Sequence, residues 1–153
     1  MSDHPILFAY DGSGSAKVAI SQAAEHLQSG RRALVLTVWE PLSAAFIGGG
    51  VAPNGLEKDV EIDARQVAEE GTRLAREAGF EAEPAVERGE PIWQRILEVA
   101  NERDVGIVVM GSAGRTGISR VLIGSVAGAV VTHSDRPVLI AHVSTARGAG
   151  ERD

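Results

Sequence analysis

Residues 105–131, which read VGIVVMGSAGRTGISRVLIGSVAGAVV, decide the fold. The apolar run at 105–110 is short and rich in β-branched residues, which predicts a buried strand. A glycine-rich segment follows and ends at Gly124 and Ser125, after which the apolar residues 126–131 predict a helix. In α/β proteins this arrangement holds phosphate, because glycine lets the backbone approach the anion and free N–H groups at the helix start donate to it. The stretch therefore predicts a nucleotide site.

Short apolar runs recur along the chain and alternate with helical patterns. Pro84 interrupts one of these runs and places that strand at a sheet edge, because proline cannot donate to a strand ladder. Strands that alternate with helices fold into a parallel sheet with right-handed crossovers and helices on both faces. The sequence therefore predicts an α/β protein with strands at residues 5–10, 32–38, 80–87, 105–110 and 137–143.

Helices are expected between these strands, and their ends are marked by particular residues. Ser15 is expected to cap the first helix, which Gly30 stops. The second is a long amphipathic helix at residues 57–78. The third has Pro91 in its first turn. Ser125 is expected to cap the fourth, whose amino terminus carries about half a positive charge.

The ends of three predicted strands are expected to meet in one crevice. In a parallel sheet of this kind, ligands bind outside the carboxyl ends of the strands, where the strand order reverses. Asp11, Val38 and Gly111 each lie at the carboxyl end of a predicted strand. The long connection at residues 40–56 could lie over this crevice as a lid.

Composition narrows the class of protein. The chain has 153 residues, a net charge of −6, no cysteine and 4% aromatic residues. We expect one domain at residues 1–144 and a polar, flexible tail at 145–153. Nucleic-acid binding is not expected, because a basic patch and stacking platforms are missing. With no disulfide, no apolar run of about 20 residues and no secretory leader, we expect a cytoplasmic protein that does not span a membrane.

The order and spacing of these motifs resemble the universal stress protein domain of the ATP-binding kind. The family motif is Gly, two residues, Gly, nine residues, Gly and then Ser or Thr, which this chain meets with Gly111, Gly114, Gly124 and Ser125. The resemblance runs from residue 6 to residue 143 and includes the strand end at Asp11. It implies an open five-stranded parallel sheet of order 3-2-1-4-5, which is a Rossmann-like fold of the adenine nucleotide alpha hydrolase type.

Carried over to this chain, the resemblance implies a role for each matching position. Asp11 would lie near the ribose and adenine, and Val38 would offer main-chain groups to the adenine edge. The start of the fourth helix would meet the phosphates, with which Mg²⁺ could bind. Arg115 lies within the glycine-rich segment and could neutralise phosphate charge. The full nucleotide-binding set would be Ala9, Asp11, Val38, Met110, Gly111, Gly114, Arg115, Gly124, Ser125 and Val126.

The fifth strand, which begins at Pro137 and ends at Val143, is apolar and expected at a sheet edge, where exposure would be costly. The resemblance implies a homodimer formed by pairing of this strand between subunits.

Three functions stay open. The first is a regulatory protein in which ATP orders the glycine-rich loop and acts on the dimer surface. The second is a slow Mg²⁺-dependent ATPase that uses Asp11 and Arg115. The third is a dimeric adaptor with a vestigial nucleotide site.

Other residue patterns point to ordinary structural roles. The segment before Lys17 is not a Walker A loop, because Ala16 stands where that motif has glycine. The four histidines are dispersed without the spacing of metal ligands. No catalytic residue and no protein metal site are therefore predicted. Glu69 and Glu70 are expected to lie on a solvated face of the second helix.

Overall fold

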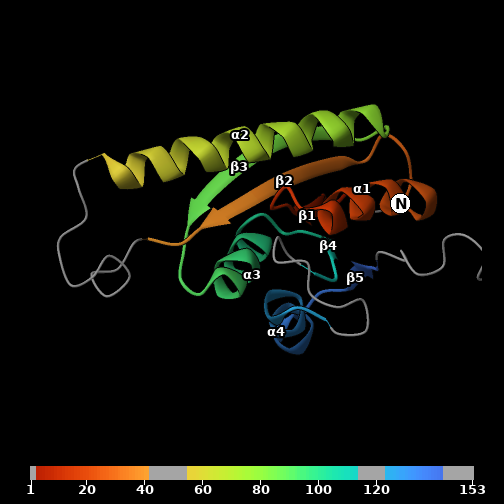
Figure 1. The fold of residues 1–153 in the computed structure, drawn as a ribbon. Coiled ribbons are helices and arrows are strands. Elements are labelled where there is room, and N and C mark those ends of the chain that lie inside the picture. The colour runs from red at the N-terminus through yellow and green to blue at the C-terminus, as the bar shows by residue number, and fades with distance from the viewer. Residues whose placement is uncertain (1–2, 42–54, 114–122, 143–153) are drawn as a thin grey trace, which may run out of the picture.

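The computed structural model describes residues 3–41, 55–113 and 123–142. Over these residues five strands alternate with four helices: β1 (Ile6–Ala9), α1 (Gly14–His26), β2 (Arg32–Trp39), α2 (Leu56–Glu77), β3 (Glu81–Arg88), α3 (Ile92–Glu102), β4 (Ile107–Gly111), α4 (Ser125–His133) and β5 (Val138–Ala141). All paired strands are parallel, and the sheet has the order β3-β2-β1-β4-β5 (Figure 1). The predicted fold class and strand order are therefore confirmed.

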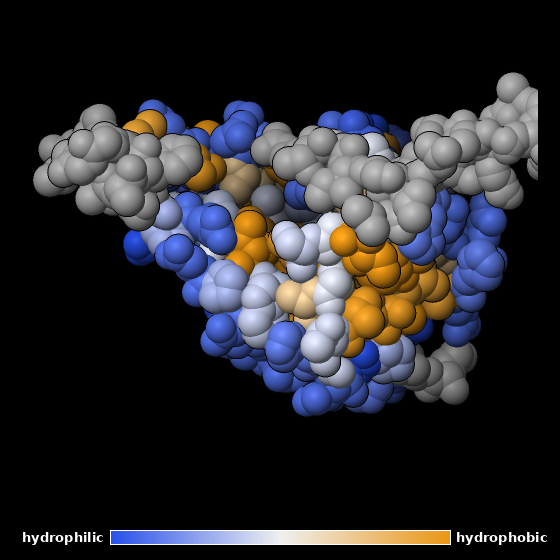
Figure 2. Space-filling view, turned by 60° about the horizontal axis from the view of Figure 1, so that its bottom comes forward, coloured by the Kyte–Doolittle hydropathy of each residue, from blue (hydrophilic) through white to orange (hydrophobic). Residues whose placement is uncertain are grey.

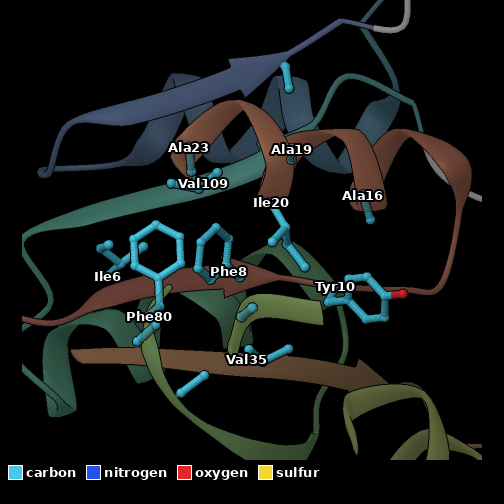
Figure 3. Packing of buried hydrophobic residues seen from close by; sticks show 14 residues of the cluster. Ile6, Phe8, Tyr10, Ala16, Ala19, Ile20, Ala23, Val35, Phe80 and Val109 are labelled. Carbon is cyan, nitrogen blue, oxygen red and sulfur yellow. The ribbon is translucent and has the colours of Figure 1, made fainter. Parts of the chain in front are cut away.

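Helices cover both faces of the sheet because side chains along each strand alternate between two cores. Ile6 and Phe8 of β1 point into the core beneath α1 and α2, whereas Leu7 points into the core beneath α3 and α4. Figure 3 shows the first core, in which the rings of Phe8 and Phe80 meet edge to face with their centroids 5.5 Å apart. The central strand β1 is thus buried on both sides, which explains why it reads as a continuous apolar run.

The amino ends of three helices differ from the predictions by one or two residues. α1 is capped by Ser13, whose Oγ accepts from the Ala16 N–H at 3.1 Å, while Ser15 is buried inside the helix. The residue before α4 is Gly124, so Ser125 is its first helical residue and not its cap. Likewise Pro91 precedes the first turn of α3. In each case the chain turns into the helix through an extended residue.

The two outer strands of the sheet are β3 and β5. In the part of the chain that the structure describes, β3 pairs with β2 alone, so the expected edge position of Pro84 is confirmed. β5 pairs only with β4 among the described residues. Val143, at the predicted end of the fifth strand, and the predicted tail at 145–153 lie outside the described residues. Within the described parts of the chain, no helix is both long and apolar enough to cross a membrane.

Candidate nucleotide site

A cavity of about 420 Å³ opens where β1, β2 and β4 end. The start of α4, the amino-terminal half of α2 and residues of α1 and α3 complete its walls. Its size falls in the range of small-molecule sites. Gly114 and Arg115 lie outside the described residues, as do residues 42–54 of the predicted lid. The other members of the predicted set all line this cavity: Ala9, Asp11, Val38, Met110, Gly111, Gly124, Ser125 and Val126.

Asp11 lies in the turn that connects β1 to α1. Its Oδ1 accepts a hydrogen bond from the Ser13 N–H at 2.9 Å, which shapes the turn before the helix begins. The preceding residue, Tyr10, stays tied to β2 through its N–H, which donates to the Leu36 carbonyl at 2.9 Å. One carboxylate oxygen of Asp11 thus fixes the loop, and the residue borders the cavity next to the end of β2.

The main chain of Val38 faces the space beyond the end of β1. Gly89 N–H donates to the Trp39 carbonyl at 3.0 Å, so Trp39 faces β3. Successive residues of a parallel strand turn their N–H and C=O groups to opposite neighbours, so those of Val38 face the β1 side. The β1 ladder ends there at the pair Ala9 and Leu36, and the Tyr10 carbonyl accepts from the Thr37 hydroxyl at 2.8 Å.

Three hydrogen bonds hold the two ends of the glycine-rich segment. Ser112 donates its N–H to the Ala141 carbonyl of β5 at 2.9 Å, and its own carbonyl accepts from the Gly124 N–H at 2.7 Å. The Ala113 N–H donates to Ser15 Oγ at 3.2 Å. Ser15, which was expected to be a cap, therefore ties α1 to this segment.

Gly111 lets α1 approach the end of β4 closely. A Cβ added to Gly111 would lie 1.9 Å from Ser15 Oγ, so a side chain there would push α1 away. The residue thus serves the packing of the sheet as well as the wall of the cavity.

The first turn of α4 presents backbone donors at the cavity. The first N–H that bonds within the helix is that of Gly128, which donates to the Gly124 carbonyl. Three earlier N–H groups therefore have no partner within the helix, and they belong to Ser125, Val126 and Ala127. These free N–H groups and the helix dipole favour an anion at this end of the cavity.

The wall formed by α2 was missed by the sequence reasoning. Val60, Asp63, Ala64 and Val67 recur at helical spacing and line the cavity. The apolar spacing was visible in the sequence, but it could not tell which part of the helix meets the strand ends.

Glu69 is exposed, as expected, whereas Glu70 is only partly exposed and links α2 to Tyr10, the residue after β1. The Tyr10 hydroxyl donates to Glu70 Oε1 at 2.7 Å, and Lys17 Nζ lies 3.8 Å from Glu70 Oε2. Burial raises the pKa of Tyr10 well above its ordinary value, and the hydrogen bond to Glu70 raises it further. A Cβ on Gly71 would lie 2.6 Å from the Tyr10 ring, so this glycine makes room for the buried ring.

The charges around the cavity are unevenly distributed. Asp11 and Asp63 provide carboxylates on the side of β1 and α2, whereas the helix start at α4 favours negative charge. Within residues 3–41, 55–113 and 123–142, no group of three or more His, Asp and Glu side chains could hold a metal ion. The arrangement suits a ligand with an anionic end at α4 and hydrogen-bond donors at the opposite end.

These features define an α/β protein with a small-molecule-sized cavity at its strand ends, and comparison with known proteins identifies its family. The universal stress protein family model matches residues 4–142, so the chain belongs to this family. Universal stress protein YxiE of Bacillus subtilis is 31% identical over 150 residues, an alignment that covers 88% of this chain and 96% of that protein. Universal stress protein MJ0577 of Methanocaldococcus jannaschii is 30% identical over 87 residues, which are 57% of this chain and 53% of that protein.

Solved structures show the same fold. The structure of MJ0577 matches with a TM-score of 0.74 and 24% identity over 92% of this chain and 96% of that chain. A universal stress protein from Archaeoglobus fulgidus, solved in complex with dAMP, matches with a TM-score of 0.65 and 27% identity over 90% of this chain and 97% of that chain. A member of this family therefore binds an adenine nucleotide.

Proposed function

We propose that this protein is an ATP-binding regulator of the stress response. ATP binds in the crevice at the carboxyl ends of β1, β2 and β4, and the state of the glycine-rich loop and of the dimer surface carries the signal. The observation that supports this most strongly is the single cavity that joins the three strand ends to the start of α4. The dAMP complex of the Archaeoglobus fulgidus relative supports an adenine nucleotide as the ligand.

In this proposal the polarity of the cavity orients the nucleotide. The triphosphate lies at the first turn of α4, where free N–H groups and the dipole offset the repulsion expected from a chain of net charge −6. Mg²⁺ bound to the phosphates would lower their charge. The ribose and base then extend toward Asp11 and Val38, where the main chain of Val38 can donate to and accept from a base edge. Arg115 remains a proposed partner of the phosphates.

The decisive test removes one backbone donor while keeping the helix. Proline suits the first position of a helix, and Gly124 before it already has the extended backbone that proline requires (φ −62°, ψ 164°). Ser125→Pro therefore deletes the N–H, and Ser125→Ala is the matched control that deletes only the hydroxyl. A hydrogen bond to a charged group contributes about 1.5–3 kcal/mol, so we expect Ser125→Pro to weaken ATP binding about tenfold or more.

Calorimetric titration with Mg²⁺ and ATP measures this difference directly. Absence of saturable binding by the wild type would contradict the proposed function. Equal affinities for Ser125→Pro and Ser125→Ala would contradict the proposed placement of the phosphates. Phosphate release measured on the same samples separates binding from slow hydrolysis.

We also propose that the protein forms a homodimer by pairing of β5 along its outer edge. The Val108 N–H of β4 donates to the Pro137 carbonyl, and the N–H of Ser112, just after β4, donates to the Ala141 carbonyl. By the alternation of a parallel ladder, the main-chain groups of Ile140 face the outer edge of the sheet. Figure 2 shows hydrophobic side chains gathered on the side of the molecule that carries α4, where Val131 is 48% exposed.

A matched pair of variants tests this pairing. Ile140→Pro and Ile140→Ala both shorten the side chain, but only proline loses the N–H that faces the outer edge. Light scattering is expected to give the dimer mass for the wild type and Ile140→Ala, and the monomer mass for Ile140→Pro. A monomeric wild type at micromolar concentration would contradict the proposal.

A further inference from the structure

Asp63 is a charged residue of the cavity wall to which neither the family motif nor the strand-end pattern assigns a role. It lies on α2, between Val60 and Val67, and all three residues line the cavity. Asp63 is exposed, so it stands at the rim of the cavity. The side chain is far along the chain from the glycine-rich segment, yet the fold brings both to one cavity.

The position of Asp63 is set by partly buried contacts further along α2. Val67 Cγ1 lies 3.5 Å from the point that a Cβ on Gly12 would occupy, so α2 packs directly on the turn after Asp11. The Tyr10 hydroxyl holds Glu70 one turn later. Asp63 precedes Val67 by four residues, which is a rise of about 6 Å along the helix.

On its other side, this part of α2 approaches the end of β2. Lys58 and Glu61 share a groove with Trp39, the residue after Val38. In Figure 1 the amino-terminal end of α2 lies at the arrowhead ends of β2 and β3. Asp63 therefore lines the same cavity as Asp11, in the turn after β1, and Val38, near the end of β2.

We propose that Asp63 selects the base of the nucleotide by accepting a hydrogen bond from the exocyclic amino group of adenine. This inference rests on the proposed ATP site. An ionised carboxylate can only accept hydrogen bonds, and the amino group of adenine can donate one to it and one to the Val38 carbonyl. Hypoxanthine carries a carbonyl oxygen at the same ring position, so acceptors would face one another and stay unpaired. Sites built to pair a donor reject analogues that lack it.

The carboxylate also acts on the orientation of the ligand. Asp63 lies on α2 and Asp11 in the turn after β1, whereas the backbone donors belong to α4, so a reversed nucleotide would bring its phosphates toward two carboxylates. Like charges at close range are unfavourable. Base selection and phosphate placement thus depend on opposite ends of one cavity.

Binding of ATP and of inosine triphosphate, measured side by side with Mg²⁺ present, tests the inference. The variants are Asp63→Asn, whose amide can either donate or accept, and Glu69→Gln as the control. Glu69 is an exposed carboxylate on the same helix and does not line the cavity. A change in phosphate repulsion affects the binding of both nucleotides equally. The ratio of the two dissociation constants therefore reports only the contribution of the base to binding.

We expect the wild type and Glu69→Gln to prefer ATP and Asp63→Asn to reduce this preference about tenfold, as for one hydrogen bond to a charged group. An unchanged ratio in Asp63→Asn, with ATP still bound, would overturn the role of Asp63 and leave the ATP site in place. Equal binding of both nucleotides by the wild type would have the same meaning. If the wild type binds neither nucleotide, the proposed function fails and the inference falls with it.

Discussion

Tyr10 provides the sharpest test of how the cavity wall is held, because it is the single tyrosine of the chain. Its side chain is 2% exposed, and its hydroxyl donates to Glu70 Oε1 at 2.7 Å. Burial and then Glu70 raise its pKa well above the ordinary value of about 10. We predict that Tyr10 keeps its proton in the folded protein at a pH where an exposed tyrosine has lost it.

The raised pKa makes stability depend on pH in one direction. Below about pH 10 the folded and unfolded chains both hold the proton, so Tyr10 contributes its full stabilisation. Above about pH 10 only the unfolded chain releases the proton, and the free energy of unfolding falls by up to about 1.4 kcal/mol per pH unit until the folded state also ionises. Tyr10→Phe lacks this slope.

At neutral pH, Tyr10→Phe should lower the free energy of unfolding by about 1–2 kcal/mol. The phenyl ring fills the same space, so the loss is that of one hydrogen bond to a charged group. Glu70 is 41% exposed and regains water, which limits the cost of leaving it without the hydroxyl.

Two measurements check the prediction. Absorbance of tyrosinate in the near ultraviolet follows Tyr10 alone, with Tyr10→Phe as the blank. Denaturant unfolding of both proteins between about pH 8 and about pH 11 gives the difference in slope, in which other titrating groups cancel. A folded-state midpoint near pH 10, or equal slopes for the two proteins, would refute the reasoning.

Three further substitutions have expected outcomes that denaturant unfolding can measure. Gly71→Ala places a methyl group against the Tyr10 ring and should destabilise the protein by about 1–3 kcal/mol; an unaltered midpoint would contradict the packing described. Among the described residues, a Cβ at Gly128 would meet only Ile123, at 4.0 Å, so Gly128→Ala should stabilise α4 by about 0.5–1 kcal/mol. Arg95→Gln breaks ion pairs with carboxylates of β3 and α3; its cost of about 1 kcal/mol should shrink as salt is added, and a salt-independent effect would argue against a charge-based cause.

The strands could be predicted because a strand that is buried on both faces has a continuous run of apolar residues. β1 and β4 contribute to both cores and read as unbroken apolar runs. Apolar periodicity does not order strands, so the arrangement 3-2-1-4-5 came from the resemblance of the glycine motif. The first helix cap was missed because Ser13 and Ser15 are chemically equal candidates. Ser13 is the cap because the Asp11 carboxylate accepts a hydrogen bond from its N–H and so shapes the turn before the helix. This contact exists only in the folded turn.

The site residues that belong to short sequence motifs could be predicted. Those that reach the site through the packing of a distant helix could not. The residues at the strand ends and at the start of α4 follow from the sheet topology and the glycine spacing. Asp63 and Glu70 look like ordinary surface charges of an amphipathic helix. Their positions depend on how α2 packs against the sheet and the turn after β1, where the Tyr10 ring fits beside Gly71, 61 positions later in the chain.

The hydrogen bond between the Gly124 N–H and the Ser112 carbonyl has a consequence for protein engineering. This bond, with the anchors of Ser112 to β5 and of Ala113 to Ser15, fixes both ends of the intervening segment from outside it. Doubling the length of a flexible loop costs only about 0.6 kcal/mol of closure entropy. Insertions between the two anchored ends should therefore leave the start of α4, and with it the backbone donors at the cavity, in place.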